Sequence, residues 1–339
     1  MTTSRAAALM RFGYTERQAN FLAIVAAHGG YFVRRHFLSY IERGHGAVTV
    51  DFLRAVLTRG HVLASRLRNH AQVYHLIAKT VYAALGDPDS RNRRRHELSA
   101  IRRRLMGVDF VLARPDWTFF ASERDIVCFF TEQQRIPSTL LPKTQYAAQD
   151  GSARHTTRYF AERFPIALSP DGACVALVYV DDADVTDAGF ERFLRRHAAL
   201  CDHLSISVEV VFLTATDGQQ LLAEHAFARV IQQSESAPTV ADATEQELLA
   251  YVRTRHAWEQ GALTGLRQEQ LDVMRTRLHT FRGGAADALY RSWQSDGDAT
   301  VRRFLDQRRL DTRAPRVRLI VHRLPFDYRP FGAWKTEGC

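Results

Sequence analysis

The chain has 339 residues, of which 46% are apolar and 24% are charged, and its formal net charge is +9. These values exclude a disordered or fibrous protein and allow two or three hydrophobic cores. The sequence has no apolar run long enough to span a membrane, no secretory signal core and no paired cysteine spacing, so we expect a cytoplasmic protein without a disulfide framework.

The positive charge is concentrated near the N-terminus. Residues 1–107 contain 18 Lys or Arg against 6 Asp or Glu, a net charge of +12. The rest of the chain contains 28 against 31, a net charge of −3. Such a division favours one module that binds a polyanion and a second part with another task. A solvated basic surface without a partner is the alternative.

Three short amphipathic segments separated by glycines follow the N-terminus. Apolar periodicity predicts helices over residues 15–28, 33–43 and 50–59, with Thr15 and Thr49 as the N-caps of the first and third. Three helices in this order are typical of a helix-turn-helix, in which the last helix enters the major groove of DNA.

A β-hairpin is predicted directly after the third helix. Residues 61–68 and 72–77 alternate apolar and polar side chains on either side of a short turn. A short helix over residues 78–85 follows and ends at Gly86. The pattern indicates a winged helix-turn-helix domain over residues 1–86, with the basic hairpin as the wing.

Polar and basic side chains of this unit are the candidate DNA contacts. Arg54 on the third helix is the best candidate for a base edge, because arginine pairs bidentately with guanine. Arg66 and Arg68 near the hairpin tip suit phosphates or a minor groove. The complete set of predicted contacts is Arg34, Arg35, Thr49, Arg54, Thr58, Arg59, Arg66, Arg68, Asn69, His70, Arg94 and Arg95.

Residues 87–107 are predicted to form a basic linker helix. The segment contains seven arginines, including Arg94 and Arg95. One interpretation is that it extends the DNA footprint along the phosphate backbone, with an affinity that salt weakens. The other is that it forms a solvated helix between domains.

From residue 108 onward, predicted strands and helices alternate. A turn at Pro170, Asp171 and Gly172 separates two of the strands. An apolar strand among these elements indicates a buried mixed sheet in an α/β domain over residues 108–233. The strands are predicted over residues 117–122, 157–169, 174–182 and 207–215, and the helices over residues 124–136, 189–204 and 219–233.

The remaining residues predict an all-α region with one final strand. Leucines recur at helical spacing over residues 244–310, and residues 316–324 read as a strand that returns to the sheet. This helical C-terminal region spans residues 244–324. The sequence leaves open whether the helices form a separate domain or pack on the sheet.

Sequence motifs for catalysis are sparse. The chain has no glycine-rich phosphate loop, HExxH motif or nucleophile elbow. A restriction-endonuclease-like site needs an acid in a turn and an acid-x-lysine on the next strand. Asp171 stands in such a turn, but Val178 and Tyr179 occupy the strand. We therefore predict no catalytic residue, no metal and no cofactor, and a metal-dependent DNA endonuclease using Asp171 with Asp181 or Asp182 is the alternative.

The stretch TERQANFLAIVAAHGGYFVRRHFLSYI and the predicted wing resemble the replication-relaxation family of winged-helix proteins from bacterial plasmids and integrative elements. The resemblance covers residues 10–85 and extends weakly to residues 170–182. It implies a DNA-binding accessory of a mobile genetic element that acts in replication, transfer or transcription regulation. Some members carry a nuclease-like second domain, and the departure at Val178 and Tyr179 implies a degenerate, non-cleaving α/β scaffold here.

Together these features predict a nucleoid-associated protein that reads double-stranded DNA with its third helix and wing and has no membrane partner. A homodimer would place two third helices on one face of the DNA. The α/β or C-terminal region would recruit a protein partner. A protein-interaction subunit, with a winged helix that docks on another protein, is a further alternative.

Overall fold

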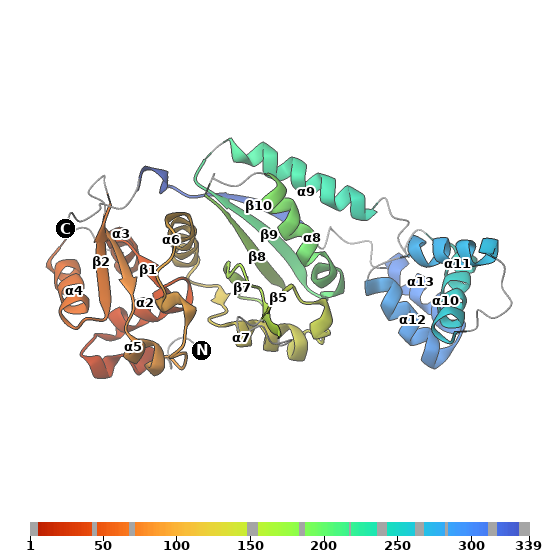
Figure 1. Cartoon of the computed structure of the whole chain (residues 1–339), viewed down its shortest axis with the longest axis horizontal. Helices are drawn as coiled ribbons and strands as arrows, with labels where there is room; N and C mark the ends of the chain where they lie inside the picture. Colours follow the sequence, from red (N-terminus) through yellow and green to blue (C-terminus); the bar gives the residue numbers. More distant parts are fainter. Residues whose placement is uncertain are drawn as a thin grey trace.

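The computed structural model describes residues 6–42, 46–67, 72–147, 155–182, 187–216, 218–235, 243–261, 268–281, 284–310 and 317–331. Within these ranges a five-stranded mixed sheet lies between an N-terminal unit of helices and short strands and a C-terminal group of helices (Figure 1). No helix in the described ranges is long and apolar enough to cross a membrane.

The N-terminal unit contains the helices and the hairpin strands that the sequence predicts. Thr15 caps α2 because its hydroxyl accepts the amide N–H of Gln18, whose side chain accepts the amide N–H of Thr15. Strand order is β1-β3-β2, and both pairings are antiparallel. The elements are η1 (Met10–Phe12), α2 (Glu16–Ala27), β1 (Tyr31–Phe32), α3 (Arg34–Ile41), α4 (Ala47–Thr58), β2 (Val62–Arg66), β3 (Gln72–Leu76) and α5 (Lys79–Ala84).

One phenylalanine from each of the first three α-helices holds this unit together. The Phe21 ring centroid lies 5.1 Å from that of Phe37 and 5.8 Å from that of Phe52, and Phe37 stacks on Phe52 at 4.0 Å. All three rings are buried. Their mutual contacts fix the positions of α2, α3 and α4 relative to one another.

Gly30 permits a close approach between the end of α2 and the segment that follows α5. Its φ is +78°, and a Cβ atom there would lie 2.5 Å from the carbonyl oxygen of Asn92. We expect Gly30→Ala to lower the free energy of unfolding by more than about 2 kcal/mol, because both the left-handed backbone and the clash with backbone oppose a side chain.

Gly86 provides the matched control for this prediction. Its φ is +86°, but a Cβ there would meet open space. Gly86→Ala should therefore cost only the backbone term, about 1 kcal/mol. Denaturant unfolding of the two variants measures the difference, and equal losses would contradict the close approach at Gly30.

The central sheet is mixed, as the sequence predicts. Its order is β10-β9-β8-β7-β4, in which β8, β9 and β10 are parallel and β7 runs antiparallel to both β8 and β4. The final strand therefore returns to the sheet beside β9. The strands are β4 (Thr118–Phe119), β7 (Ile166–Leu168), β8 (Cys174–Asp181), β9 (Ser207–Thr214) and β10 (Val317–Arg323).

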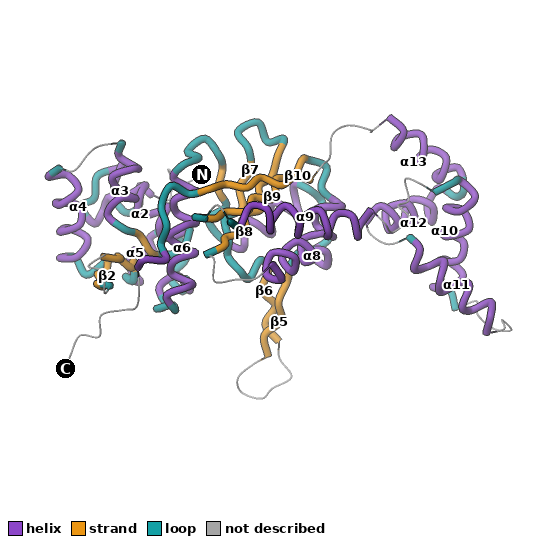
Figure 2. Tube along the Cα trace, turned by 90° about the horizontal axis from the view of Figure 1, so that it is seen from above, coloured by secondary structure: helices purple, strands orange, loops and turns teal. Residues whose placement is uncertain are grey.

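Two predictions in this region are wrong in detail. The single strand expected over residues 157–169 divides into β6 (His155–Tyr159) and β7. Strand β6 pairs with β5 (Lys143–Ala147) in a two-stranded arm that projects from the sheet (Figure 2). The helix expected over residues 124–136 is the short α7 (Glu123–Cys128), which continues into a π-helical turn, Phe129–Gln133.

Helices cover both faces of β8, which explains its unbroken apolar sequence. Helices α8 (Asp187–His203) and α9 (Gln219–Glu235) cover one face, and α6 (Leu98–Leu112) covers the other. Successive side chains of a strand point to opposite faces. Val175, Leu177 and Tyr179 accordingly pack with the first pair of helices, and Ala176, Val178 and Val180 pack with α6.

Helix α6 corrects the prediction of a basic linker helix that ends at residue 107. It extends to Leu112, and its Ile101, Leu105 and Phe110 are buried. The same cluster includes Tyr31 of the N-terminal unit and Val178 of the sheet. The N-terminal unit and the sheet therefore share a core across α6, which is neither a solvated spacer nor an exposed strip.

The C-terminal helices have a hydrophobic core of their own. Leu248, Tyr251, Leu289 and Val301 are among its buried residues. The group lies at the opposite end of the molecule from the N-terminal unit and contacts α8 through α12 (Figure 1). Its members are α10 (Glu245–Glu259), α11 (Gln268–Thr280), α12 (Gly284–Asp296) and α13 (Ala299–Leu310).

Candidate nucleic-acid interface

Three of the predicted contact residues are exposed on three elements of the N-terminal unit. Arg34 lies in the first turn of α3, Arg54 on α4 and Arg66 at the end of β2. The Arg54 side chain is 69% exposed, and its Nη1 donates to Asp51 Oδ1 at 3.0 Å. An ion pair this exposed contributes little stability, so the Arg54 guanidinium can exchange it for another acceptor.

Four further predicted contacts are also exposed. Thr58 and Arg59 lie at the end of α4, and Arg94 and Arg95 follow η2 (Arg91–Arg93). The Arg59 guanidinium lies 4.6 Å from the centre of the Tyr14 ring, which holds it against the N-terminal unit. These residues are accessible on the surface of the N-terminal part of the chain.

The structure contradicts the prediction for Thr49. Helix α4 begins at Ala47, after Gly46 as the N-cap, so Thr49 lies inside the first turn. Its exposed fraction is 1%. A residue buried this way contacts no DNA. Arg68, Asn69 and His70 lie outside the described residues.

Arg35 is the second correction, because it belongs to a polar cluster inside the protein. Its Nη1 and Nη2 donate to the two oxygens of Asp109, each at 2.6 Å. The hydroxyl of Tyr328 donates to Asp109 Oδ2 at 2.6 Å, and His36 Nε2 lies 3.0 Å from Oδ1. We call Arg35, His36, Asp109 and Tyr328 the junction cluster.

Hydrogen bonds assign the protonation state of His36 in this cluster. The amide of Val33 donates to His36 Nδ1 at 3.3 Å, so Nδ1 carries no proton and Nε2 carries one. Burial lowers the pKa of His36, and the contact with Asp109 opposes this shift. Burial opposes ionisation of Asp109, but His36 and Arg35 outweigh it and hold the pKa of that carboxyl well below its usual range.

The junction cluster connects three segments that are far apart in the sequence. Asp109 lies on α6, 74 residues from Arg35, and Tyr328 lies 293 residues from Arg35, beyond the final strand. The Arg35 guanidinium also stacks on the Phe326 ring at 3.7 Å. Sequence reasoning missed this cluster because no local pattern pairs residues at such distances.

The arginines of α6 also face inward. Arg102 Nη2 donates to the carbonyl oxygen of Arg329 at 3.3 Å. Arg104 donates to the carbonyl oxygen of Ala100 and to His96 Nε2. Arg102 and Arg104 therefore contact other parts of the protein, and the interpretation of the arginines of residues 87–107 as a strip for DNA phosphates stays a prediction.

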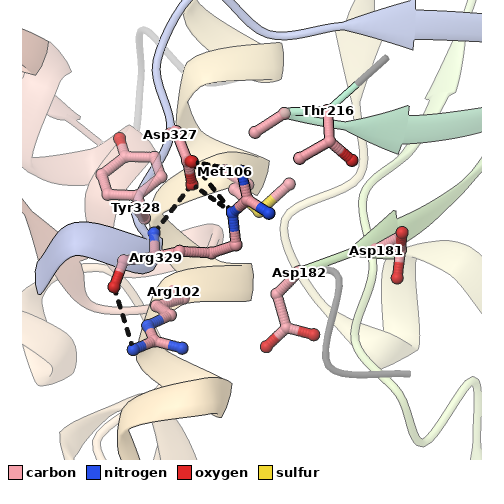
Figure 3. A pocket seen from close by; sticks show the side chains of 9 residues that line it. Arg102, Met106, Asp181, Asp182, Thr216, Asp327, Tyr328 and Arg329 are labelled. Atoms are coloured by element: carbon pink, nitrogen blue, oxygen red, sulfur yellow. Dashed lines mark hydrogen bonds and ion pairs between the residues drawn. The ribbon is translucent and has the colours of Figure 1, made fainter. Parts of the chain in front are cut away.

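A second polar region lies at the carboxyl end of β8. Asp181 and Asp182 are 2% and 4% exposed and line a cavity of about 10 Å³ with Arg102 and the segment of residues 327–329 (Figure 3). Such a space holds a single water molecule at most. The segment therefore fills the edge of the sheet where open α/β sheets bind ligands.

Asp171 is too far from these aspartates for the endonuclease site that was the alternative to a protein without catalytic residues. Asp171 lies in the turn before β8, whereas Asp181 is the last residue of that strand. Eight extended residues span about 25 Å, so the two carboxylates share no metal ion. Within the described ranges, no three His, Cys, Asp or Glu side chains are grouped to hold a metal.

Comparisons with known proteins give no match. No family model matches the chain, and neither a curated protein nor a solved structure matches it. The resemblance of residues 10–85 to the replication-relaxation family therefore stays a prediction from the sequence.

Proposed function

We propose that the chain is a double-stranded DNA-binding protein whose N-terminal unit is a winged helix-turn-helix. In this proposal α4 is the recognition helix, and β2 and β3 form the wing. The observation that carries it is the exposure of Arg34, Arg54 and Arg66 on α3, α4 and β2, within a segment of net charge +12. In a winged helix, the helix before the recognition helix contacts the DNA backbone, the recognition helix contacts base edges, and the wing contacts phosphates.

The exposed face of α4 suits a mixed readout of bases. Arg54 can donate two N–H hydrogen bonds to O6 and N7 of a guanine, and the neighbouring methyl groups of Ala47 and Val50 can contact a thymine methyl. Both apolar residues are exposed. The resemblance of residues 10–85 to the replication-relaxation family suggests the process in which the protein acts, namely the replication, transfer or transcription of a mobile genetic element.

Arg54 and Arg66 are expected to contribute differently to DNA binding. Arg54→Ala should change the preferred sequence, because a bidentate base contact contributes about 1–3 kcal/mol of discrimination. Arg66→Ala should weaken binding to all duplexes alike and lower the salt slope by about 1. The measurement is binding of the full chain to random genomic duplex fragments at several salt concentrations, followed by sequencing of the retained fragments.

Arg275→Ala is the control, because Arg275 is an exposed arginine on α11, in the C-terminal group. It should leave both the enriched sequence and the salt slope unchanged. If Arg54→Ala and Arg66→Ala also leave both unchanged, α4 and β2 are not the DNA reader.

Exposed apolar side chains favour a second candidate, a protein-docking function of the same surface. Val48, Val50 and Leu57 on α4 are 48%, 42% and 38% exposed, and Leu63 on the adjacent β2 is 56% exposed. Val50 and Leu57 are seven residues apart and share one face of α4, and contiguous exposed apolar side chains mark interaction sites. Association with a purified protein partner that salt does not weaken, together with no DNA affinity near physiological salt, would favour this candidate.

A further inference from the structure

A cavity lined by arginines lies where the N-terminal unit meets the sheet domain. Its volume is about 220 Å³, and it is bounded by the end of α2, by α6 and by residues 162–165. The charged residues of its lining are Arg103, Arg104, Arg163 and Glu162. None of the arginines proposed to contact DNA lines it.

The single carboxylate of the lining is engaged elsewhere. Glu162 forms an ion pair with Arg196 of α8. Arg103 of the lining also has an ion-pair partner outside the cavity, because its Nη1 lies 3.9 Å from Oδ1 of the buried Asp182. Glu162 and Arg103 thus each have an ion-pair partner outside the lining, and Arg104 and Arg163 are the other charged residues of the cavity.

Neutral groups accept the hydrogen bonds of the other two arginines. Arg163 Nη1 donates to Asn92 Oδ1 at 3.2 Å, and Arg104 donates to the carbonyl oxygen of Ala100 at 3.3 Å and to His96 Nε2 at 3.1 Å. Arg104 Nε is buried and has no hydrogen-bond partner in the described part of the chain. Arg104 and Arg163 thus donate to neutral acceptors rather than to a carboxylate.

Charges outside the lining only partly offset this excess. Asp87 and Glu123 attract Arg163, whereas Arg91 and Arg158 repel it. Burial, together with repulsion from Arg163 and Arg103, lowers the pKa of Arg104 to about 10. The site thus favours a ligand that brings negative charge and several acceptor oxygens.

We propose that this cavity binds a phosphate-type oxyanion, either inorganic phosphate or the phosphate group of a small molecule. Guanidinium groups bind phosphate oxygens in a fork geometry, and Arg104 and Arg163 both line this cavity. A bound oxyanion contacts α2, α6 and residues 162–165 together, so it holds the N-terminal unit on the sheet domain. This ligand is separate from the DNA proposed for the exposed face of α4.

Titration of the full chain with inorganic phosphate, with chloride at matched ionic strength as the reference, tests the proposal. We expect saturable binding of one phosphate by calorimetry, and a rise in the thermal unfolding midpoint that chloride does not produce. Titration with glycerol 3-phosphate distinguishes the sources. If glycerol 3-phosphate binds more tightly than inorganic phosphate, the ligand is a phosphorylated small molecule. If glycerol 3-phosphate binds more weakly, the ligand is the free phosphate ion.

Two variants and one control connect the binding to the cavity. Arg104→Gln and Arg163→Gln should each weaken phosphate binding at least about tenfold. The side chain of Arg104 packs against Gly29, so Arg104→Gln can disturb the fold. Arg163 is exposed, so Arg163→Gln should preserve the fold and still test the cavity. Arg275→Gln on α11 should bind phosphate as the original chain does.

The proposal is overturned if phosphate stabilises the chain no more than chloride, or if Arg163→Gln binds phosphate with unchanged affinity. Duplex DNA affinity provides a further check, because Arg163→Gln should leave it unchanged. A matching loss of DNA affinity would place the cavity in a DNA footprint and overturn its assignment to a small oxyanion.

Discussion

Asp109→Ala is expected to lower the free energy of unfolding by about 3 kcal/mol, because it removes the carboxylate that accepts from Arg35, His36 and Tyr328. The side chains of Asp109 and Arg35 are only 10% and 25% exposed, so water compensates little of the loss. Denaturant unfolding of the full chain at neutral pH measures the change.

The pH dependence of stability provides a second readout of the same cluster. The pKa of Asp109 is lower in the folded chain than its ordinary value of 3.8. Its contribution is therefore complete above about pH 5 and is lost as the pH falls through 3.8 toward the folded pKa. We expect the original chain to lose more stability than Asp109→Asn between pH 6 and pH 3.

Asp51→Ala is the matched control for Asp109→Ala. Asp51 also pairs with an arginine, Arg54, but both side chains are more than 60% exposed. Its removal should change the free energy of unfolding by no more than about 0.5 kcal/mol. Similar losses for Asp51→Ala and Asp109→Ala would contradict a structural role for the junction cluster.

Replacing Arg34, Arg54 and Arg66 together with alanine is expected to lower the affinity for duplex DNA at least about 100-fold. Each replacement removes a charge-assisted hydrogen bond worth about 1.5–3 kcal/mol. The slope of log affinity against log salt should fall by about 2, because Arg34 and Arg66 are the proposed contacts to the phosphate backbone and each contributes about one. Binding isotherms at several salt concentrations measure both quantities.

Three arginines of the C-terminal helices form the control set for this prediction. Arg275, Arg302 and Arg303 have side chains 55%, 73% and 61% exposed. Their joint replacement with alanine changes the net charge equally but leaves α3, α4 and β2 intact. A comparable loss of affinity in both variants would indicate nonspecific attraction by overall charge.

Local sequence patterns determined which elements form. The Thr15 capping box starts α2, and the turn at Pro170 to Gly172 separates β7 from β8. The apolar run of residues 175–180 forms a buried strand because both faces of β8 are covered. The capping box and the turn depend on neighbours a few residues away, and the apolar run is itself visible in the sequence.

The error for Thr49 arose because a small shift in the start of a helix changes which of its first residues are buried. A start of α4 at Ala47 places Thr49 three and four residues before Phe52 and Leu53, which are buried. Residues at these spacings share a helix face, so Thr49 turns inward. Apolar periodicity predicted the helix but not the position of its first residue, since Gly46 and Thr49 are both acceptable N-caps.

The sequence by itself determined the uneven charge, the three helices and hairpin of the N-terminal unit, the buried sheet strands and the C-terminal helices. Only the tertiary structure decided that Arg35 pairs with Asp109, that α6 packs on the sheet, and that Arg104 and Arg163 meet at one cavity. Periodicity indicates whether a side chain is buried. It does not indicate which distant segment buries it, because that partner is chosen by long-range packing.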